Sequence, residues 1–193
     1  MRTRLFGLLL AAAPVLAIVP AGCTAPPPAW TLDLSGLNVS IGGDPDMWAI
    51  NTAQWAFADP ARTRGLPVEG ARAAAALEYM AVQINTAPRW AEIDPISKEE
   101  LLRARVELRA ALGIRPDAPS QQVVSSLLHA AQALAAGDGA AATAALNNPI
   151  FTAGPQQTLA VLGALPYLRE ANIATMHVGA NFIGGGGVVR WKL

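Results

Sequence analysis

Alanine is the residue that most constrains how this chain folds, because 40 of the 193 residues are alanine. Alanine has the highest helix propensity of all residues and adds little bulk, so alanine-rich helices can pack closely. Apolar residues make up 52% of the chain and charged residues 15%, unlike the composition of a disordered chain. A chain of this length also buries a core without disulfides or metals. We therefore predict an all-α fold.

Apolar residues at helical spacing, bounded by proline, glycine and capping residues, predict a compact bundle of about six helices. Asp44 and Pro45 are typical of an N-cap and a first helical residue, and Ser97 with Glu100 is typical of a capping box. Pro166 predicts a break or kink in the last helix. The expected helices are 45–57, 67–87, 98–112, 121–136, 139–146 and 155–178.

The two ends of the chain have a different pattern. Apolar residues alternate between Trp30 and Ile41, and Val188, Val189 and Trp191 form a second short extended candidate. We expect these N- and C-terminal extended segments to pair or to lie side by side.

The first nineteen residues are typical of an export signal. Two arginines in residues 1–4 precede an apolar run from Leu5 to Val19 that contains no charge. The run is shorter than the roughly twenty residues that cross a bilayer core, and Pro14 interrupts it. This predicts a leader peptide rather than a permanent transmembrane anchor.

The next four residues, Pro20-Ala21-Gly22-Cys23, resemble the lipobox of bacterial lipoproteins, with proline where leucine is most frequent. The resemblance implies that residues 1–22 are removed and that Cys23, the only cysteine, carries diacylglycerol and an acylated amino terminus. The sequence then divides into the signal peptide 1–22, the lipidated cysteine with its proline-rich spacer 23–29, and a single helical domain 30–193. The alternative is an ordinary secretory signal, which leaves Cys23 free or removes it.

A lipid on Cys23 would attach the domain durably, because two or three acyl chains bind a membrane far more strongly than one. By analogy with enterobacterial sorting, Thr24 after the cysteine indicates the outer membrane facing the periplasm. The other location is the outer face of a plasma membrane.

Charge and motifs exclude several kinds of partner and chemistry. Fourteen basic and fourteen acidic residues cancel, and no basic stripe predicts nucleic-acid binding. The two histidines, His129 and His177, are far apart, so neither a metal nor another cofactor is expected. We expect a solvent-facing His129 and a partly buried, hydrogen-bonded His177. Aspartates that precede prolines, at positions 44, 59 and 94, are explained as caps and turn starts.

Tryptophans are the candidate binding residues. Trp48 and Trp55 are two helical turns apart and project from one side of the first expected helix. Core packing explains them, whereas the functional alternative is that they and Trp90 line a groove for a glycan, peptide or partner helix.

The sequence thus predicts an envelope-anchored, non-enzymatic domain that binds or scaffolds an envelope protein or peptidoglycan. The alternative is a cell-wall-active enzyme or enzyme accessory, with a site built from dispersed acidic and aromatic residues.

Overall fold

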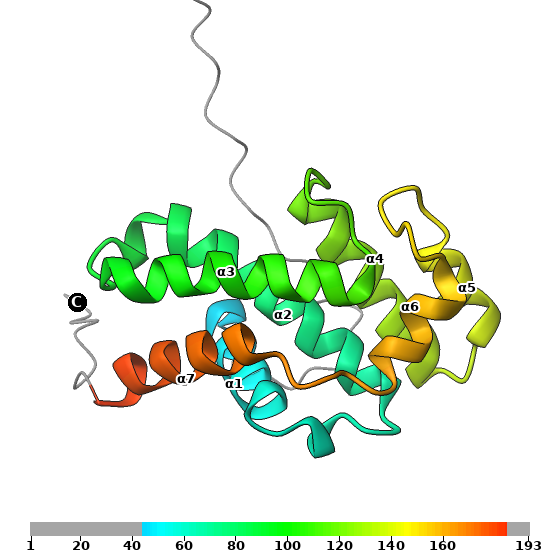
Figure 1. Cartoon of the computed structure of the whole chain (residues 1–193), viewed down its shortest axis with the longest axis horizontal. Helices are drawn as coiled ribbons and strands as arrows, with labels where there is room; N and C mark the ends of the chain where they lie inside the picture. Colours follow the sequence, from blue (N-terminus) through cyan, green and yellow to red (C-terminus); the bar gives the residue numbers. More distant parts are fainter. Residues whose placement is uncertain (1–43, 185–193) are drawn as a thin grey trace, which may run out of the picture.

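The computed structural model describes residues 44–184, which form seven α-helices and two short 3-10 helices (Figure 1). The α-helices are α1 (Pro45–Ala58), α2 (Pro67–Thr86), α3 (Pro95–Leu112), α4 (Ser120–Ala135), α5 (Gly139–Leu146), α6 (Pro155–Leu162) and α7 (Arg169–Gly184). The 3-10 helices η1 (Pro60–Arg62) and η2 (Pro88–Trp90) follow α1 and α2. The predicted all-α bundle is confirmed for this range. Cys23, the leader, the spacer and the extended segments 30–41 and 188–191 lie outside the described residues, so those expectations stay predictions.

Aspartate followed by proline begins three of these elements. Asp44 caps α1 by accepting a hydrogen bond from the amide of Asp46 at 2.9 Å, as expected. Asp59 caps η1. Asp94 caps α3 by accepting from the amide of Ser97 at 2.9 Å. The expected capping box at Ser97 is therefore wrong, because Pro95 already has the fixed φ of a first helical residue and the helix starts earlier.

The last predicted helix, 155–178, is two helices. Helix α6 ends at Leu162, residues 163–168 are not helical, and α7 begins at Arg169. Pro166 lacks an amide proton and disfavours helical geometry in the residue before it. The result is a break rather than a kink, which raises the count from about six helices to seven within the described range.

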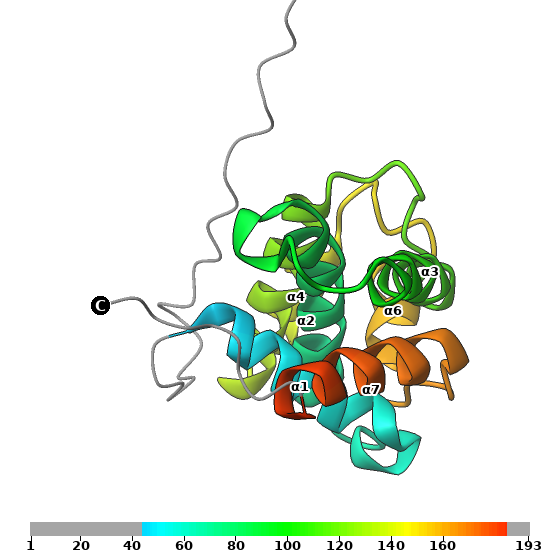
Figure 2. The ribbon, with the colours of Figure 1, turned by 90° about the vertical axis from the view of Figure 1, so that its left-hand side faces the viewer.

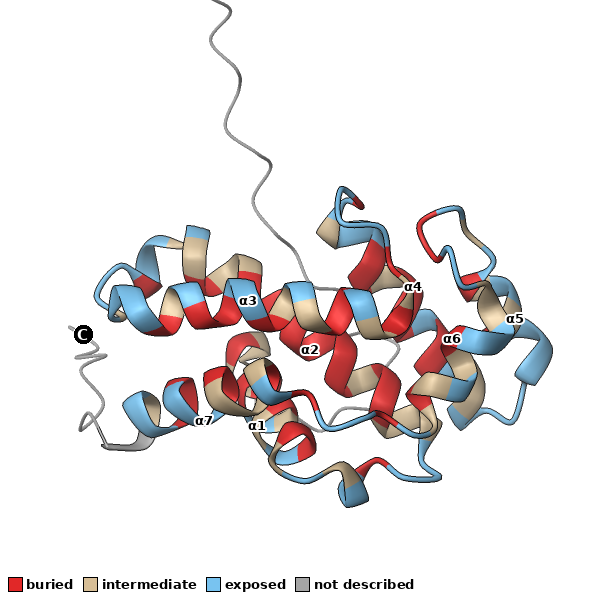
Figure 3. Ribbon diagram, in the orientation of Figure 1, coloured by how far each residue is buried: buried red, intermediate tan, exposed pale blue. Residues whose placement is uncertain are grey.

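Helix α2 is the centre of the bundle and packs against α1, α3, α4 and α6. Figure 3 shows buried residues along most of its length. The expected inner face is buried, and Ala73 to Ala76 are buried as well, so that α2 is covered on nearly every side. A helix lined by alanine fits there because its surface lies close to its axis.

Two glycines mark where backbones come closest. A Cβ atom on Gly70 of α2 would clash with the carbonyl oxygen of Leu162 at the end of α6. Gly113 ends α3 in the left-handed conformation, with φ of 64°, and lies against Ala153. An antiparallel bridge between Ile114 and Phe151 joins the loop between α3 and α4 to the loop between α5 and α6.

Helices α3 and α7 run antiparallel along the surface of the bundle. Glu107, late in α3, accepts from the amide of Ala171 in the first turn of α7 at 3.0 Å. Near the other end of the pair, His177 contacts Glu100 and Asn181 contacts Ser97. The start of α3 and the end of α7 therefore lie together, at the left of Figure 1.

Candidate functional site

The first and last described helices meet at η2, between α2 and α3. The indole nitrogen of Trp90 donates to Asp46 in the first turn of α1 at 2.9 Å. The ring of the same tryptophan packs against Phe182 of α7, with 6.3 Å between centroids. Figure 2 shows α1 and α7 close together on the side that faces the viewer. Both ends of the described chain thus converge on one short segment.

A carboxylate is buried at the centre of this junction. Asp46 accepts from the Tyr79 hydroxyl at 2.6 Å and from the Trp90 indole at 2.9 Å, and it pairs with the Arg89 guanidinium at 2.9 Å. These three donors offset the cost of removing the charge from water. Burial, and the hydrogen bond to Asp46, raise the pKa of Tyr79, so its hydroxyl stays a proton donor.

Arg89 joins the junction to the cap of α1. Its guanidinium bonds Asp44 at 2.9 Å and lies 4.8 Å from the centre of the Trp90 ring. The hydrogen bond from Arg89 holds the pKa of Asp44 below its ordinary value, and the same bond raises the pKa of Arg89. We call Asp44, Asp46, Tyr79, Arg89 and Trp90 the Asp46 cluster. Its carboxylates are matched by donors from α2 and η2, which fix the start of α1.

The three candidate tryptophans lie in different surroundings. Trp48 and Trp90 are buried, with exposed fractions of 6% and 5%, whereas Trp55 is 43% exposed. The core interpretation of Trp48 and Trp55 is therefore confirmed for Trp48 and wrong for Trp55, whose ring is open to solvent. The structure does not bring the three tryptophans together on one surface. Arg62 of η1 donates to the carbonyl of Trp55 at 2.8 Å, with its guanidinium 6.0 Å from the indole ring.

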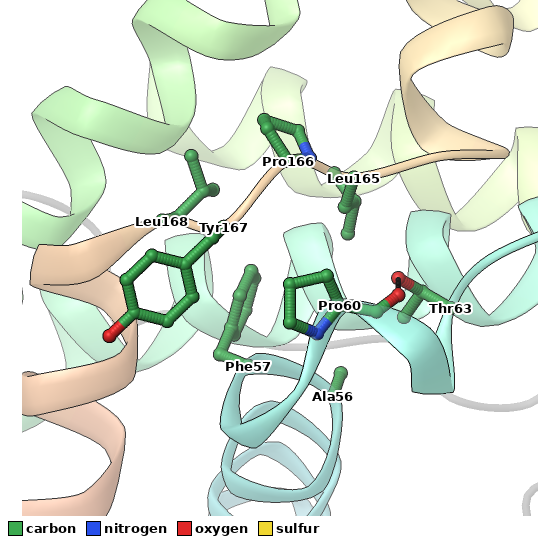
Figure 4. A pocket seen from close by; sticks show the side chains of 8 residues that line it. All are labelled: Ala56, Phe57, Pro60, Thr63, Leu165, Pro166, Tyr167 and Leu168. Atoms are coloured by element: carbon green, nitrogen blue, oxygen red, sulfur yellow. Dashed lines mark hydrogen bonds between the residues drawn. The ribbon is translucent and has the colours of Figure 1, made fainter.

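A shallow hollow lies at the end of α1, where α1 and η1 face the segment between α6 and α7 (Figure 4). Its volume is about 10 Å³, room for about one water molecule. Tyr167 stands beside it with 58% of its surface exposed. We call it the Pro60 hollow. It is lined by Ala56, Phe57, Pro60, Thr63, Leu165, Pro166, Tyr167 and Leu168.

The histidines do not form a metal site in the described residues. His129 is exposed, as expected. His177 has the expected hydrogen bond, because its Nδ1 lies 2.7 Å from Oε2 of Glu100. Its expected partial burial is wrong, since this face of α7 is open to solvent. Within residues 44–184, no group of three histidine, cysteine or acidic side chains is arranged to hold a metal ion.

The sequence interpretation missed a second buried ion pair. Glu78 of α2 is fully buried and accepts from Nε of Arg109 at 3.0 Å. Arg109 also donates to the carbonyl of Pro116 at 2.8 Å and to Ser120 at 3.0 Å, which secures the loop between α3 and α4. The available signal was a glutamate inside an alanine-rich, apolar helix, since a charged residue there needs a partner.

Comparison of the chain with protein-family models, with curated proteins and with solved structures finds no match. Across residues 44–184, none of the helices combines the length and the apolar character needed to cross a bilayer. What the protein does is therefore inferred from its own residues.

Proposed function

We propose that this protein is a bacterial envelope lipoprotein, held at a membrane by lipid on Cys23, whose helical domain binds another envelope component without catalysing a reaction. The observation that carries the proposal is the order of cationic start, apolar run and lipobox-like residues around the only cysteine. The expected location is the outer membrane facing the periplasm, or otherwise the outer face of a plasma membrane.

The geometry of α1 supports a binding role. The chain enters the bundle at Asp44, and the Pro60 hollow and Trp55 lie toward the other end of the helix. Fourteen helical residues span about 21 Å. A tether at one end of α1 therefore leaves Trp55 and the Pro60 hollow, toward the other end, accessible to a partner.

The chemistry of that surface favours a protein partner. Trp55 and Tyr167 are exposed aromatic side chains, which supply rigid contact area at a low cost in conformational entropy. The Pro60 hollow beside Tyr167 has room for only about one water molecule, so a partner would contact the exposed rings rather than enter the hollow. We infer that an envelope protein packs apolar side chains against these two rings.

Mass spectrometry of the protein purified from its native membrane tests the attachment. The expected amino-terminal residue is Cys23, carrying diacylglycerol on the thiol and an amide-linked acyl chain. A Cys23→Ser variant is expected to lose the lipid and to leave the membrane fraction. An unmodified Cys23, or a mature protein that begins elsewhere, would contradict the proposal.

Affinity capture after crosslinking in intact cells tests the binding. We expect one reproducible envelope protein with the wild-type chain and at least a tenfold lower yield with Trp55→Ala combined with Tyr167→Ala. Met176→Ala on α7 is the matched control, since Met176 is 44% exposed and lies about two helical turns beyond the start of α7. Retention on purified peptidoglycan with no captured protein would instead indicate attachment to the wall.

A further inference from the structure

Ile96, at the start of α3, is the most exposed of the large apolar side chains in the described range, at 68%. Its neighbours on both sides contact α7. Asn181 donates to the carboxylate of Asp94 at 2.9 Å and to the Ser97 hydroxyl at 3.1 Å. The first turn of α3, which carries Ile96, therefore lies beside the last turn of α7. These two helix ends are at the left of Figure 1.

The surroundings of Ile96 are acidic. Glu92, Asp94 and Glu99 are all exposed. Glu99 is paired with Arg103 at 3.1 Å, and Lys98 donates to the carbonyl of Ala91. Arg89, the other cation nearby, binds Asp44 and Asp46. Residues 44–184 contain ten basic and thirteen acidic side chains, so the described domain has an acidic excess. We call Glu92, Asp94, Ile96 and Glu99 the Ile96 surface.

The chain continues from this place with a segment of complementary chemistry. Residues 185–193 read Gly-Gly-Gly-Val-Val-Arg-Trp-Lys-Leu, with four large apolar residues, two cations and no acid. Nine residues reach about 30 Å when extended. That length is several times the distance from the last turn of α7 to its neighbour in the first turn of α3.

We propose that the Ile96 surface is the docking site of the chain's own C-terminal segment, residues 188–193. In this proposal Val188, Val189 and Trp191 cover Ile96, while Arg190 and Lys192 pair with Glu92 and share Glu99 with Arg103. A short glycine linker keeps the segment at a millimolar effective concentration, so that a weak contact suffices for occupancy. This proposal stands independently of the function proposed above.

Site-specific photocrosslinking in the full-length protein, in its native membrane, tests the docking. With a benzophenone amino acid at position 96, we expect an intramolecular crosslink whose peptide mass maps to residues 188–193. The same probe at Val106 is the control, since that position is equally exposed on the same helix. It should give at least a fivefold lower yield. Crosslinks from position 96 to residues 30–41, to lipid, to a second copy or to another protein would overturn the proposal, and so would the absence of a crosslink.

Charge reversal tests the same contact by a second route. Arg190→Glu combined with Lys192→Glu should lower the crosslink yield at least fivefold, because the segment would then carry the same charge as the surface. Adding Glu92→Lys and Glu99→Lys should restore it. Circular dichroism and the melting temperature of each variant verify that the bundle remains folded. A yield that does not respond to the first pair of changes would refute the docking.

Discussion

The two halves of α2 are packed in different ways. In the first half, Gly70 lets the backbone of α6 come close, and the other buried residues are alanines, whose side chain is a single methyl group. In the second half, Glu78 and Tyr79 are equally buried but reach to other elements through hydrogen bonds with Arg109 and Asp46. Helix α2 thus contacts its neighbours through close apolar packing in its first half, and also through hydrogen bonds of buried polar side chains in its second half.

This difference shows what fixes the position of each half of α2 against its neighbours. Alanine loses no side-chain entropy when it is buried, but a surface of alanine fixes position only through close fit. A buried polar group instead selects one arrangement, because a lost partner leaves an unsatisfied group in a medium of low dielectric constant. The first half should therefore be sensitive to added volume and the second half to removed partners.

The largest effect is expected from Glu78→Ala, which leaves the Arg109 guanidinium buried without its carboxylate. We expect the free energy of unfolding to fall by about 3–5 kcal/mol, the usual result of breaking a buried ion pair from one side. Urea denaturation measures it. The double variant Glu78→Ala with Arg109→Met should recover part of the loss, since no buried charge remains but the carbonyl of Pro116 loses its donor. A loss below about 1 kcal/mol in the single variant would mean that this half does not depend on its polar bonds.

Gly70→Ala tests the other half with a single methyl group. The new Cβ meets the backbone carbonyl of Leu162, which cannot move like a side chain, so α2 and α6 must separate. We expect a loss of about 2–3 kcal/mol, as for overpacking in a rigid core. The control is Gly139→Ala at the start of α5, where nothing lies within 4 Å of the new atom. Equal melting temperatures for the two variants would show that the close approach is not required.

Asp46→Asn tests whether the bond between Asp46 and Tyr79 of α2 depends on the charge of the carboxylate or only on its shape. The amide keeps the shape of the carboxylate but turns a donor toward the Tyr79 hydroxyl or the Trp90 indole. The expected loss is about 2 kcal/mol by chemical denaturation, since a buried donor is left unsatisfied. The more exposed Asp44→Asn should cost less than about 1 kcal/mol. If both substitutions cost the same, burial would not be what makes the Asp46 cluster strong.

The smallest expected effect is on how the stability of the protein depends on pH in acid. Because its pKa in the folded protein is lowered from 3.8 by Arg89, Asp44 contributes stability that is present above pH 3.8 and is lost as the pH falls through the lower, folded value. Asp44→Asn should therefore reduce the dependence of stability on pH below about pH 4, by a few tenths of a kcal/mol because solvent screens this exposed pair. Melting temperatures of both proteins between pH 5 and pH 3 measure the difference. If the melting temperatures of the two proteins fell in parallel with pH, Asp44 would not contribute to the loss of stability in acid.

Local chemistry was enough to predict the helices, because proline, aspartate and alanine act within a turn or two. The pairs that hold the second half of α2 join residues 31 and 33 positions apart, and no local periodicity identifies such partners. The spacing of Trp48 and Trp55 correctly gave their direction around α1. The spacing did not predict how deeply each tryptophan is buried. Two side chains on the same side of α1 are buried to the same extent only if the packed neighbours cover that side over its whole length.

The Asp46 cluster also determines how the bundle responds to pulling. Tension that arrives through the residues before Pro45 acts first on Asp44 and Asp46, which are bonded to α2 and η2 as well as to their own helix. Several of these bonds must rupture together before α1 can unwind from its first turn. A force applied at that end is thus shared with residues 33 to 45 positions further along the chain. We therefore expect α1 to stay attached to the bundle under a force that would unwind an isolated helix.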